Sequence, residues 1–196
     1  MQPRTITVLI VLGDLKNAFL SLLRDRCRNP ALLNIYSFID ICAALANDGK
    51  AKNHDIFETY LKEFCTVPWV ACSLYDLWAA RCSLVHAFSP LGHHTAKPDG
   101  AKPIFYYSWT DRREEFQRVV QSKGYTEFLI LDIDHVKHVA IDAFNSLYRR
   151  VETDEVFESR FLQNAEHFLF DLEAFKLEAE LLFLQVEKNS TVSDTE

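Results

Sequence analysis

The chain has 196 residues, which fits one domain, and its 48% hydrophobic and 13% aromatic content can build a sizeable core. Only five glycines and six prolines occur, so long regular elements are expected and a turn-rich β-sandwich is disfavoured. The net charge of −7 argues against broad binding to nucleic acids. The acidity is concentrated in residues 151–196, with 12 acidic and 3 basic side chains, so residues 1–150 could still present a local basic face.

Two features indicate the compartment. The five cysteines lack CxxC spacing, and we interpret them as reduced core residues: Cys27, Cys42, Cys65, Cys72 and Cys82. No stretch reaches the roughly 18–20 consecutive apolar residues that span a bilayer. The apolar run 6–12 is followed by Asp14 and Lys16 and not by a signal-peptide cleavage site. The sequence therefore predicts a cytoplasmic protein that does not engage a membrane.

Four helices are predicted in the first half of the chain. Apolar side chains recur at helical spacing over residues 5–28, 31–47 and 53–64. The β-branched residues near the start of the first helix could instead form a strand. A fourth helix is expected to begin after Ser73, which is a favourable N-cap, and to end at the turn that contains Pro90.

The second half is predicted to insert a small β unit among the helices. The polar stretch 93–103 is expected to be a loop. Two aromatic or apolar β candidates follow at 104–109 and 128–131, and a charged helical piece at 112–123 separates them.

Two more helices complete the prediction. They are expected at 134–151, with Asp134 as the N-cap, and at 155–187. The sequence as a whole predicts a mainly α domain over residues 1–188: an up-and-down helical bundle with a small β insertion near 104–133. Residues 189–196 are predicted to be a disordered tail.

The residues best suited to chemistry lie late in the fourth helix, in the segment Arg81-Cys82-Ser83-Leu84-Val85-His86. Arg81 and His86 are about 140° apart on an ideal helix and so do not share a face. We expect His86 to lie just beyond the last regular turn and the long side chain of Arg81 to bend toward that end of the helix. A guanidinium binds phosphate with two hydrogen bonds, and an imidazole transfers protons near neutral pH. The pair therefore suits phosphodiester chemistry. Alternatively, Arg81 only pairs with Asp76 or Asp40, and His86 is a satisfied helix-end histidine.

The pattern Arg81-x-x-x-x-His86, late in an amphipathic helix, resembles the HEPN superfamily of higher eukaryotic and prokaryotic nucleotide-binding domains. The segment 77–86 also resembles uncharacterised bacterial proteins in which an Arg-Cys-x-x-x-His core precedes a loop and an aromatic strand, here 104–109. Asp40 matches the acidic residue that those proteins carry in an earlier helix. The resemblance implies a helical bundle that often forms a homodimer, in which two Arg–His pairs meet across the interface.

Catalytic members of this superfamily are metal-independent endoribonucleases. By this resemblance, Arg81 is expected to orient and neutralise the phosphate. His86 is expected to act as general base or acid, which gives a 2′,3′-cyclic phosphate end. Substrate contacts are expected from the residues that adjoin or could pair with Arg81, namely Asp40, Asp76, Cys82 and Ser83. Active members typically carry a polar Asn, Asp or His at the position of Cys82.

The leading hypothesis is therefore RNA or nucleotide binding, or RNA cleavage, in a bacterial stress or defence setting, with no cofactor. The alternative is a catalytically silent helical homodimer that binds a protein partner or a nucleotide. Two groups of side chains are of the types that bind metal ions. The histidines near Gly92 are interpreted as a solvated loop, and the acidic and histidine residues at 132–138 as an N-cap with a polar helix face.

Overall fold

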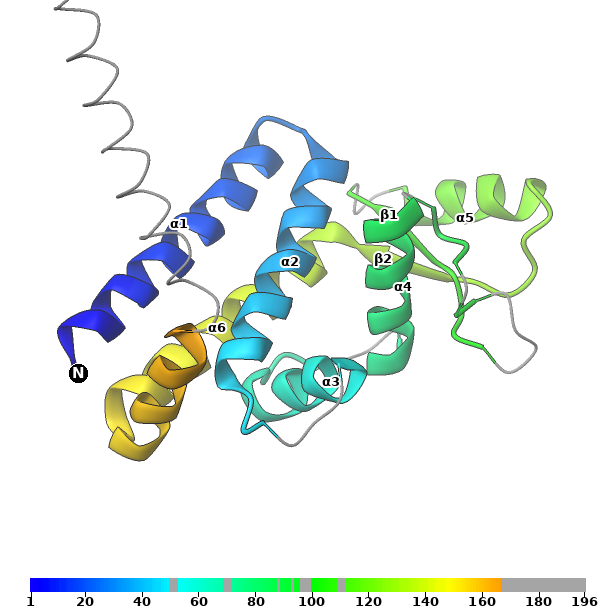
Figure 1. The fold of residues 1–196 in the computed structure, drawn as a ribbon. Coiled ribbons are helices and arrows are strands. Elements are labelled where there is room, and N and C mark those ends of the chain that lie inside the picture. Colours follow the sequence, from blue (N-terminus) through cyan, green and yellow to red (C-terminus); the bar gives the residue numbers. More distant parts are fainter. Residues whose placement is uncertain are drawn as a thin grey trace, which may run out of the picture.

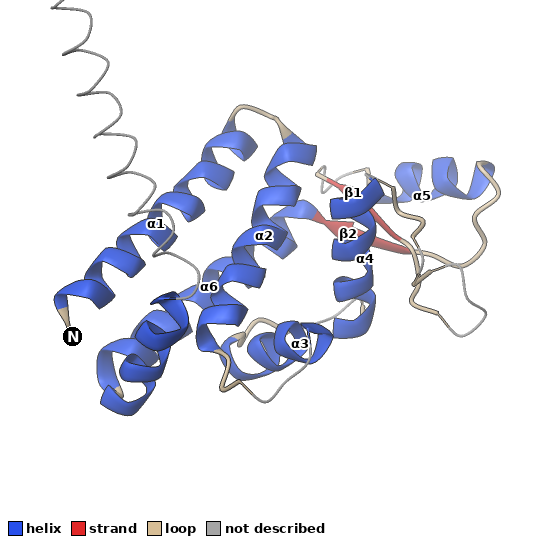
Figure 2. Ribbon diagram, in the orientation of Figure 1, coloured by secondary structure: helices blue, strands red, loops and turns tan. Residues whose placement is uncertain are grey.

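The computed structural model describes residues 1–49, 53–68, 72–87, 89–92, 94–95, 100–108 and 112–166, with the backbone alone for residues 53, 54, 86 and 87. Its elements in chain order are α1 (Pro3–Arg24), α2 (Arg28–Ala46), α3 (Asn53–Phe64), α4 (Leu74–Ala87), β1 (Ile104–Tyr107), α5 (Arg113–Ser122), β2 (Leu129–Asp132) and α6 (Ile133–Thr153), and residues 155–166 are also helical. The protein is thus a mainly α bundle with a small β insertion, as predicted (Figures 1 and 2).

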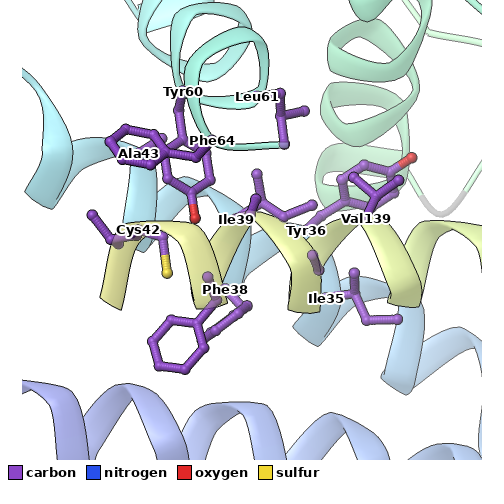
Figure 3. Packing of buried hydrophobic residues seen from close by; sticks show 14 of the residues in the cluster. Ile35, Tyr36, Phe38, Ile39, Cys42, Ala43, Tyr60, Leu61, Phe64 and Val139 are labelled. Atoms are coloured by element: carbon purple, nitrogen blue, oxygen red, sulfur yellow. The ribbon is translucent and has the colours of Figure 1, made fainter. Parts of the chain in front are cut away.

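Helix α2 is the centre of the bundle. It packs against α1, α3, α4 and α6, and Figure 1 shows it between α1 and α4. A helix with neighbours on every side must be apolar nearly all round, and ten of its residues are buried: Ala31, Leu32, Ile35, Tyr36, Phe38, Ile39, Cys42, Ala43, Leu45 and Ala46. Figure 3 shows part of this cluster, where α2 side chains meet Val139 of α6 and Leu61 of α3.

Aromatic side chains tie the central helix to its neighbours. The ring of Phe38 lies edge-on to Phe19 of α1 and to Phe144 of α6, with ring centroids 5.5 and 5.3 Å apart. Such edge-to-face pairs add to the free energy gained by burying the rings. Phe38 therefore joins three helices at one point in the core.

The β insertion is a two-stranded parallel sheet. Ile104 pairs with Leu129 and Tyr107 with Asp132, and α5 is the crossover that parallel strands require. The sheet is attached to the bundle by Ile104 and Leu131 in the core. The hydroxyl groups of Tyr36 and Tyr106 also lie 2.5 Å apart, which links β1 to α2.

The start of α4 has a reciprocal capping arrangement that confirms the predicted N-cap. Asp76 N–H donates to the Ser73 hydroxyl at 3.0 Å, and Ser73 N–H donates to the Asp76 carboxylate at 3.0 Å. The second carboxylate oxygen of Asp76 accepts from Lys102 N–H at 2.8 Å. Asp76 therefore fixes both the first turn of α4 and the segment that leads into β1.

Several sequence predictions need correction. The N-cap of α6 is Asp132, whose carboxylate accepts from Asp134 N–H at 2.9 Å, because β2 runs directly into the helix. The first helix ends at Arg24, four residues earlier than predicted, and Arg26 adopts a positive φ of 60° in the turn that follows. Its early residues are helical, which excludes the strand alternative. Cys27 is exposed and does not belong to the core.

Other predictions fall outside the described residues. The last predicted helix is observed over 155–166, and Glu158 there accepts from the Thr5 hydroxyl at 2.7 Å, which joins it to α1. Its predicted continuation to 187 and the predicted tail lie outside the described residues. The same holds for Trp109 and His93.

Two helices are long and apolar enough to cross a membrane by length and composition alone. They are α1 and α2, whose best windows have mean hydropathies of 1.8 and 1.3 and are 22% and 50% buried in the structure. Core helices of soluble proteins and signal sequences meet the same criterion. The expectation that the protein does not associate with a membrane therefore stays a prediction.

A carboxylate on α6 holds the segment that follows α3. Asp142 accepts from Thr66 N–H at 2.6 Å, from Val67 N–H at 3.2 Å and from the Thr66 hydroxyl at 2.9 Å. Burial opposes the charge of Asp142, but these hydrogen bonds outweigh it and lower the pKa of the carboxyl below its ordinary value of 3.8.

Asp142→Ala is expected to lower the free energy of unfolding at pH 7 by about 1 kcal/mol, because two N–H groups lose their acceptor. A carboxyl whose pKa is lowered in the native state stabilises the fold above its unfolded-state pKa, and this contribution is lost as the pH falls through the lowered value. The difference between wild type and variant in urea unfolding should therefore be constant from pH 5 to 7 and shrink below about pH 4. A difference that grows on acidification would contradict this account.

Candidate functional site

Arg81 and Asp40 form an ion pair between α4 and α2. Arg81 Nε donates to Asp40 Oδ2 at 2.6 Å, and Nη2 lies 2.5 Å from the same oxygen. Both contacts reach one carboxylate oxygen, so the pair is not the two-oxygen fork that gives the strongest Arg–carboxylate recognition. Nη1 is directed toward the sulfur of Cys82 at 3.7 Å. Of the two partners predicted for Arg81, Asp40 and Asp76, the structure shows Asp40.

The pair is half-buried, with 26% of the Arg81 side chain and 27% of the Asp40 side chain exposed. Burial raises the pKa of the Asp40 carboxyl by more than Arg81 lowers it. Burial acts against the charge of Arg81 as well, but the neighbouring Asp40 outweighs it and raises the pKa of the guanidinium. Arg81 therefore keeps its positive charge, whereas Asp40 is easier to protonate than an ordinary aspartate.

The ion pair lies on an open groove between α2, α3 and α4. The groove has a volume of about 350 Å³ and is lined by Asp40, Ile41, Ala43, Ala44, Ile56, Phe57, Trp78 and Arg81. Its walls are mainly apolar, and its charge is confined to the Arg81–Asp40 pair. Apolar walls with a few polar groups that fix orientation are typical of small-ligand sites, and the volume lies within their usual range.

His86 lies in the last turn of α4, since the helix continues to Ala87. This corrects the expectation that His86 lies beyond the regular turns. Five helical residues correspond to a rotation of about 500° and a rise of about 7.5 Å, so the two Cα atoms lie on different faces of α4. The side chain of His86 lies outside the described part of the structure. The helix alone does not bring the predicted catalytic pair onto one face.

The other predicted substrate contacts have different surroundings. Cys82 is partly buried beside Arg81. Asp76 is engaged in capping α4, as described above. Ser83 is buried, its hydroxyl donates to Ala79 C=O at 3.0 Å, and Gly92 packs directly on it. A Cβ at position 92 would lie 2.1 Å from the Ser83 oxygen, so this contact requires glycine. Of the predicted site residues, Arg81 and Asp40 line the groove, Cys82 lies beside Arg81 without lining it, and Asp76 and Ser83 lie outside it.

Sequence reasoning missed the apolar wall of the groove. Trp78 lies three residues before Arg81, and residues at that spacing lie on one side of a helix. The sequence therefore contained a signal for Trp78. It contained none for Phe57 and Ile56, because their place in the groove depends on how α3 crosses α2 and α4.

The two aspartates at the start of α6 have structural partners. Asp132 caps the helix, and Asp134 forms an ion pair with Lys137 at 2.6 Å. Within the described residues, no group of three or more His, Cys, Asp or Glu side chains is arranged to hold a metal ion.

Comparison with known proteins adds no relative. No family model, no curated protein and no solved structure matches the chain.

A double-mutant cycle measures the strength of the Arg81–Asp40 pair. We expect a coupling free energy of about 1–2 kcal/mol between Asp40→Ala and Arg81→Ala, above that of exposed pairs because the contacts are short and half-buried. The free energy of unfolding in urea gives this value. The exposed pair Arg118–Glu114, at 3.7 Å, is the matched control and should couple by less than about 0.5 kcal/mol. Equal coupling in the two pairs would show that the groove pair is an ordinary surface contact.

Proposed function

We propose that this protein is a HEPN-like RNA-binding protein of the cytoplasm that acts as a metal-independent endoribonuclease through Arg81 and His86. The observation that carries the proposal is the position of Arg81: a guanidinium on an open groove, held by a single carboxylate oxygen. A phosphate offers a guanidinium the two-oxygen geometry that Asp40 does not supply. An RNA phosphate can therefore compete with Asp40 for Arg81.

The apolar part of the groove suits an unpaired base. Trp78 lines it next to Arg81 and is partly exposed, whereas Phe57 is 1% exposed and belongs to the buried wall. Single-stranded RNA is commonly bound by aromatic stacking of bases beside cationic contacts to phosphates. We propose that one base occupies the groove while its phosphate contacts Arg81. Single-stranded RNA is then the preferred ligand, because a base within a duplex cannot enter the groove.

The chemistry follows from the two side chains. Arg81 neutralises the charge that develops on the phosphate as the reaction proceeds. His86 accepts the proton of the 2′-hydroxyl while the 2′-oxygen attacks phosphorus. The bond from phosphorus to the 5′-oxygen breaks, this oxygen takes a proton from water as it leaves, and His86 later returns the proton it accepted to the solvent. The products are a 2′,3′-cyclic phosphate and a 5′-hydroxyl end, and the reaction needs no metal ion.

We propose that the active form is a homodimer. Arg81 and His86 are on different faces of α4, so one chain presents them poorly to a single phosphate. Two copies related by a two-fold axis through this region could pair Arg81 of one with His86 of the other. The size of the protein in solution tests this point.

RNA binding is the first test. Fluorescence anisotropy with an unstructured single-stranded RNA in EDTA and low salt should show saturable binding by the wild type. Arg81→Gln should weaken binding by about tenfold, the usual effect of losing a charge-assisted hydrogen bond. Arg118→Gln removes an arginine from α5 outside the groove and should bind as the wild type does. Absence of binding, or equal weakening by both variants, would contradict the proposal.

The second candidate function is a catalytically silent helical homodimer that binds a protein partner or a nucleotide. The engagement of Arg81 by Asp40 favours it, because the same geometry describes a purely structural ion pair. This second function predicts that light scattering shows a dimer and that the protein does not cleave RNA. It also predicts that Arg81→Gln dimerises as the wild type does.

A further inference from the structure

Helix α1 has an apolar side that the described residues do not fully cover. Its most apolar window has a mean hydropathy of 1.8, but only 22% of that window is buried. A helix that is apolar on most sides is normally surrounded by other elements. One row of apolar residues at helical spacing stays at least partly exposed: Val11, Leu15, Ala18 and Leu22. This row is therefore a surface that another element can bury.

The described part of the chain ends beside the start of this row. Helix 155–166 lies next to the N-terminal end of α1 (Figure 1), and its last residue, Glu166, forms an ion pair with Arg4 at 3.4 Å. Arg4 lies seven residues, or about two turns, before Val11, so both residues are on the same side of α1. The chain that follows Glu166 therefore starts at the partly exposed row.

The sequence after Glu166 continues the buried side of the helix that precedes it. Glu158, Phe161 and Ala165 of that helix are buried. The same alternation of three- and four-residue steps continues beyond them through an apolar row: Phe168, Leu172, Phe175, Ala179, Leu182 and Val186. This spacing is typical of helices that pack along one another. Thirteen of the 21 residues 167–187 are apolar, so burying them against a partner is strongly favourable.

Length and charge make α1 a fitting partner. Residues 167–187 span about 30 Å as a helix, close to the length of the 22-residue α1. They include five acidic residues and one lysine, whereas α1 has three basic residues and one aspartate, so the two attract each other. Ala179 lies 13 residues after Glu166, and Ala18 lies 14 residues after Arg4. A parallel arrangement that starts at the Arg4–Glu166 contact therefore brings these two small residues together, which permits a close approach of the helices.

We propose that residues 167–187 form a helix that packs along α1 of the same chain and covers Val11, Leu15, Ala18 and Leu22. Helix α1 then lies between this helix and α2, against which it already packs. The arrangement accounts for an apolar helix that the described residues bury only in part. The exposed row of α1 is thus an internal docking surface of the protein and not a membrane-spanning face.

Hydrogen exchange of the full chain, measured by mass spectrometry, tests the proposal. Amide hydrogens of a docked helix exchange only when the helix opens, so residues 167–187 should exchange at least about tenfold more slowly than an unfolded chain. Ala18→Glu should reduce this protection about tenfold or more, because it places a charge beneath a docked acidic helix. Ala18 is exposed on the described bundle, so this substitution does not disturb the core.

Matched variants separate the proposed surface from its neighbours. Asn17→Glu adds the same charge at the adjacent exposed residue, about 100° around α1, and should leave the protection of residues 167–187 unchanged. Within the segment, Leu182→Glu should act as Ala18→Glu does. Leu184→Glu lies about 160° from Leu182 on an ideal helix and should change the protection much less.

A disulfide identifies the occupant of the surface. The double variant Ala18→Cys with Ala179→Cys should form an intramolecular disulfide on mild oxidation, located by mass spectrometry of its peptides, and Asn17→Cys with Ala179→Cys should not. An intermolecular disulfide would assign the surface to a second copy of the chain. Protection that appears only with phospholipid vesicles would assign residues 167–187 to a membrane.

Either of these two results would overturn the proposal. Unprotected exchange of residues 167–187 in the wild type, or equal effects of Ala18→Glu and Asn17→Glu, would overturn it as well. None of these measurements depends on RNA or on Arg81.

Discussion

Arg81→Gln should lower the rate of RNA cleavage by about 10²–10³-fold, which is the usual effect of removing one group that stabilises developing charge in a transition state. Glutamine keeps most of the length of the side chain and can still donate to Asp40. It is neutral, however, and cannot stabilise the negative charge of the phosphate. Single-turnover cleavage of a single-stranded RNA with excess protein measures the rate of the chemical step directly.

Two further variants separate charge from geometry. Arg81→Lys keeps the charge but loses the planar fork, so its rate should lie between those of the wild type and Arg81→Gln. Arg118→Gln, on α5, should cleave at the wild-type rate. If Arg81→Gln retains more than about a third of the wild-type rate, Arg81 is only a structural partner of Asp40 and the catalytic proposal fails.

Phe38→Ala should lower the free energy of unfolding by about 3–5 kcal/mol, the usual cost of truncating a fully buried phenylalanine. Phe38 is 1% exposed and contacts the rings of Phe19 and Phe144. Its loss leaves a cavity between α1, α2 and α6, three helices that cannot all move in to fill it. Urea unfolding monitored by circular dichroism gives the difference.

The matched control for this prediction is Val156→Ala, because Val156 is 80% exposed. It should change the free energy of unfolding by less than about 0.5 kcal/mol. A loss below about 1 kcal/mol in Phe38→Ala would mean that the packing around α2 is looser than the ring contacts indicate.

Local patterns predicted most of the fold. The apolar spacing of residues 53–64 predicted α3 to the residue, and that of residues 31–47 predicted α2 except for its first three residues, because the helix already begins at Arg28. Ser73 marked the start of α4 because its capping partner Asp76 lies three residues away. The predicted N-cap of α6 was two residues too late, because Asp132 and Asp134 can both cap a helix. Only the observation that β2 runs directly into the helix distinguishes them.

The candidate site was predictable in part. The motif identified Arg81, but its partner could be chosen only from the fold. Asp40 lies 41 positions away in sequence, and it reaches Arg81 because α2 and α4 pack together. Periodicity and capping are local properties, whereas the Arg81–Asp40 pair depends on how distant helices cross.

The most direct test of the central claim is an RNA cleavage assay in EDTA that compares wild type with His86→Ala and determines the product ends. The proposed function predicts cleavage by the wild type, with 2′,3′-cyclic phosphate and 5′-hydroxyl ends, and a loss of about 10²–10⁴-fold in the variant. No cleavage by the wild type, or equal cleavage by both proteins, would contradict it and leave the non-catalytic homodimer as the better account.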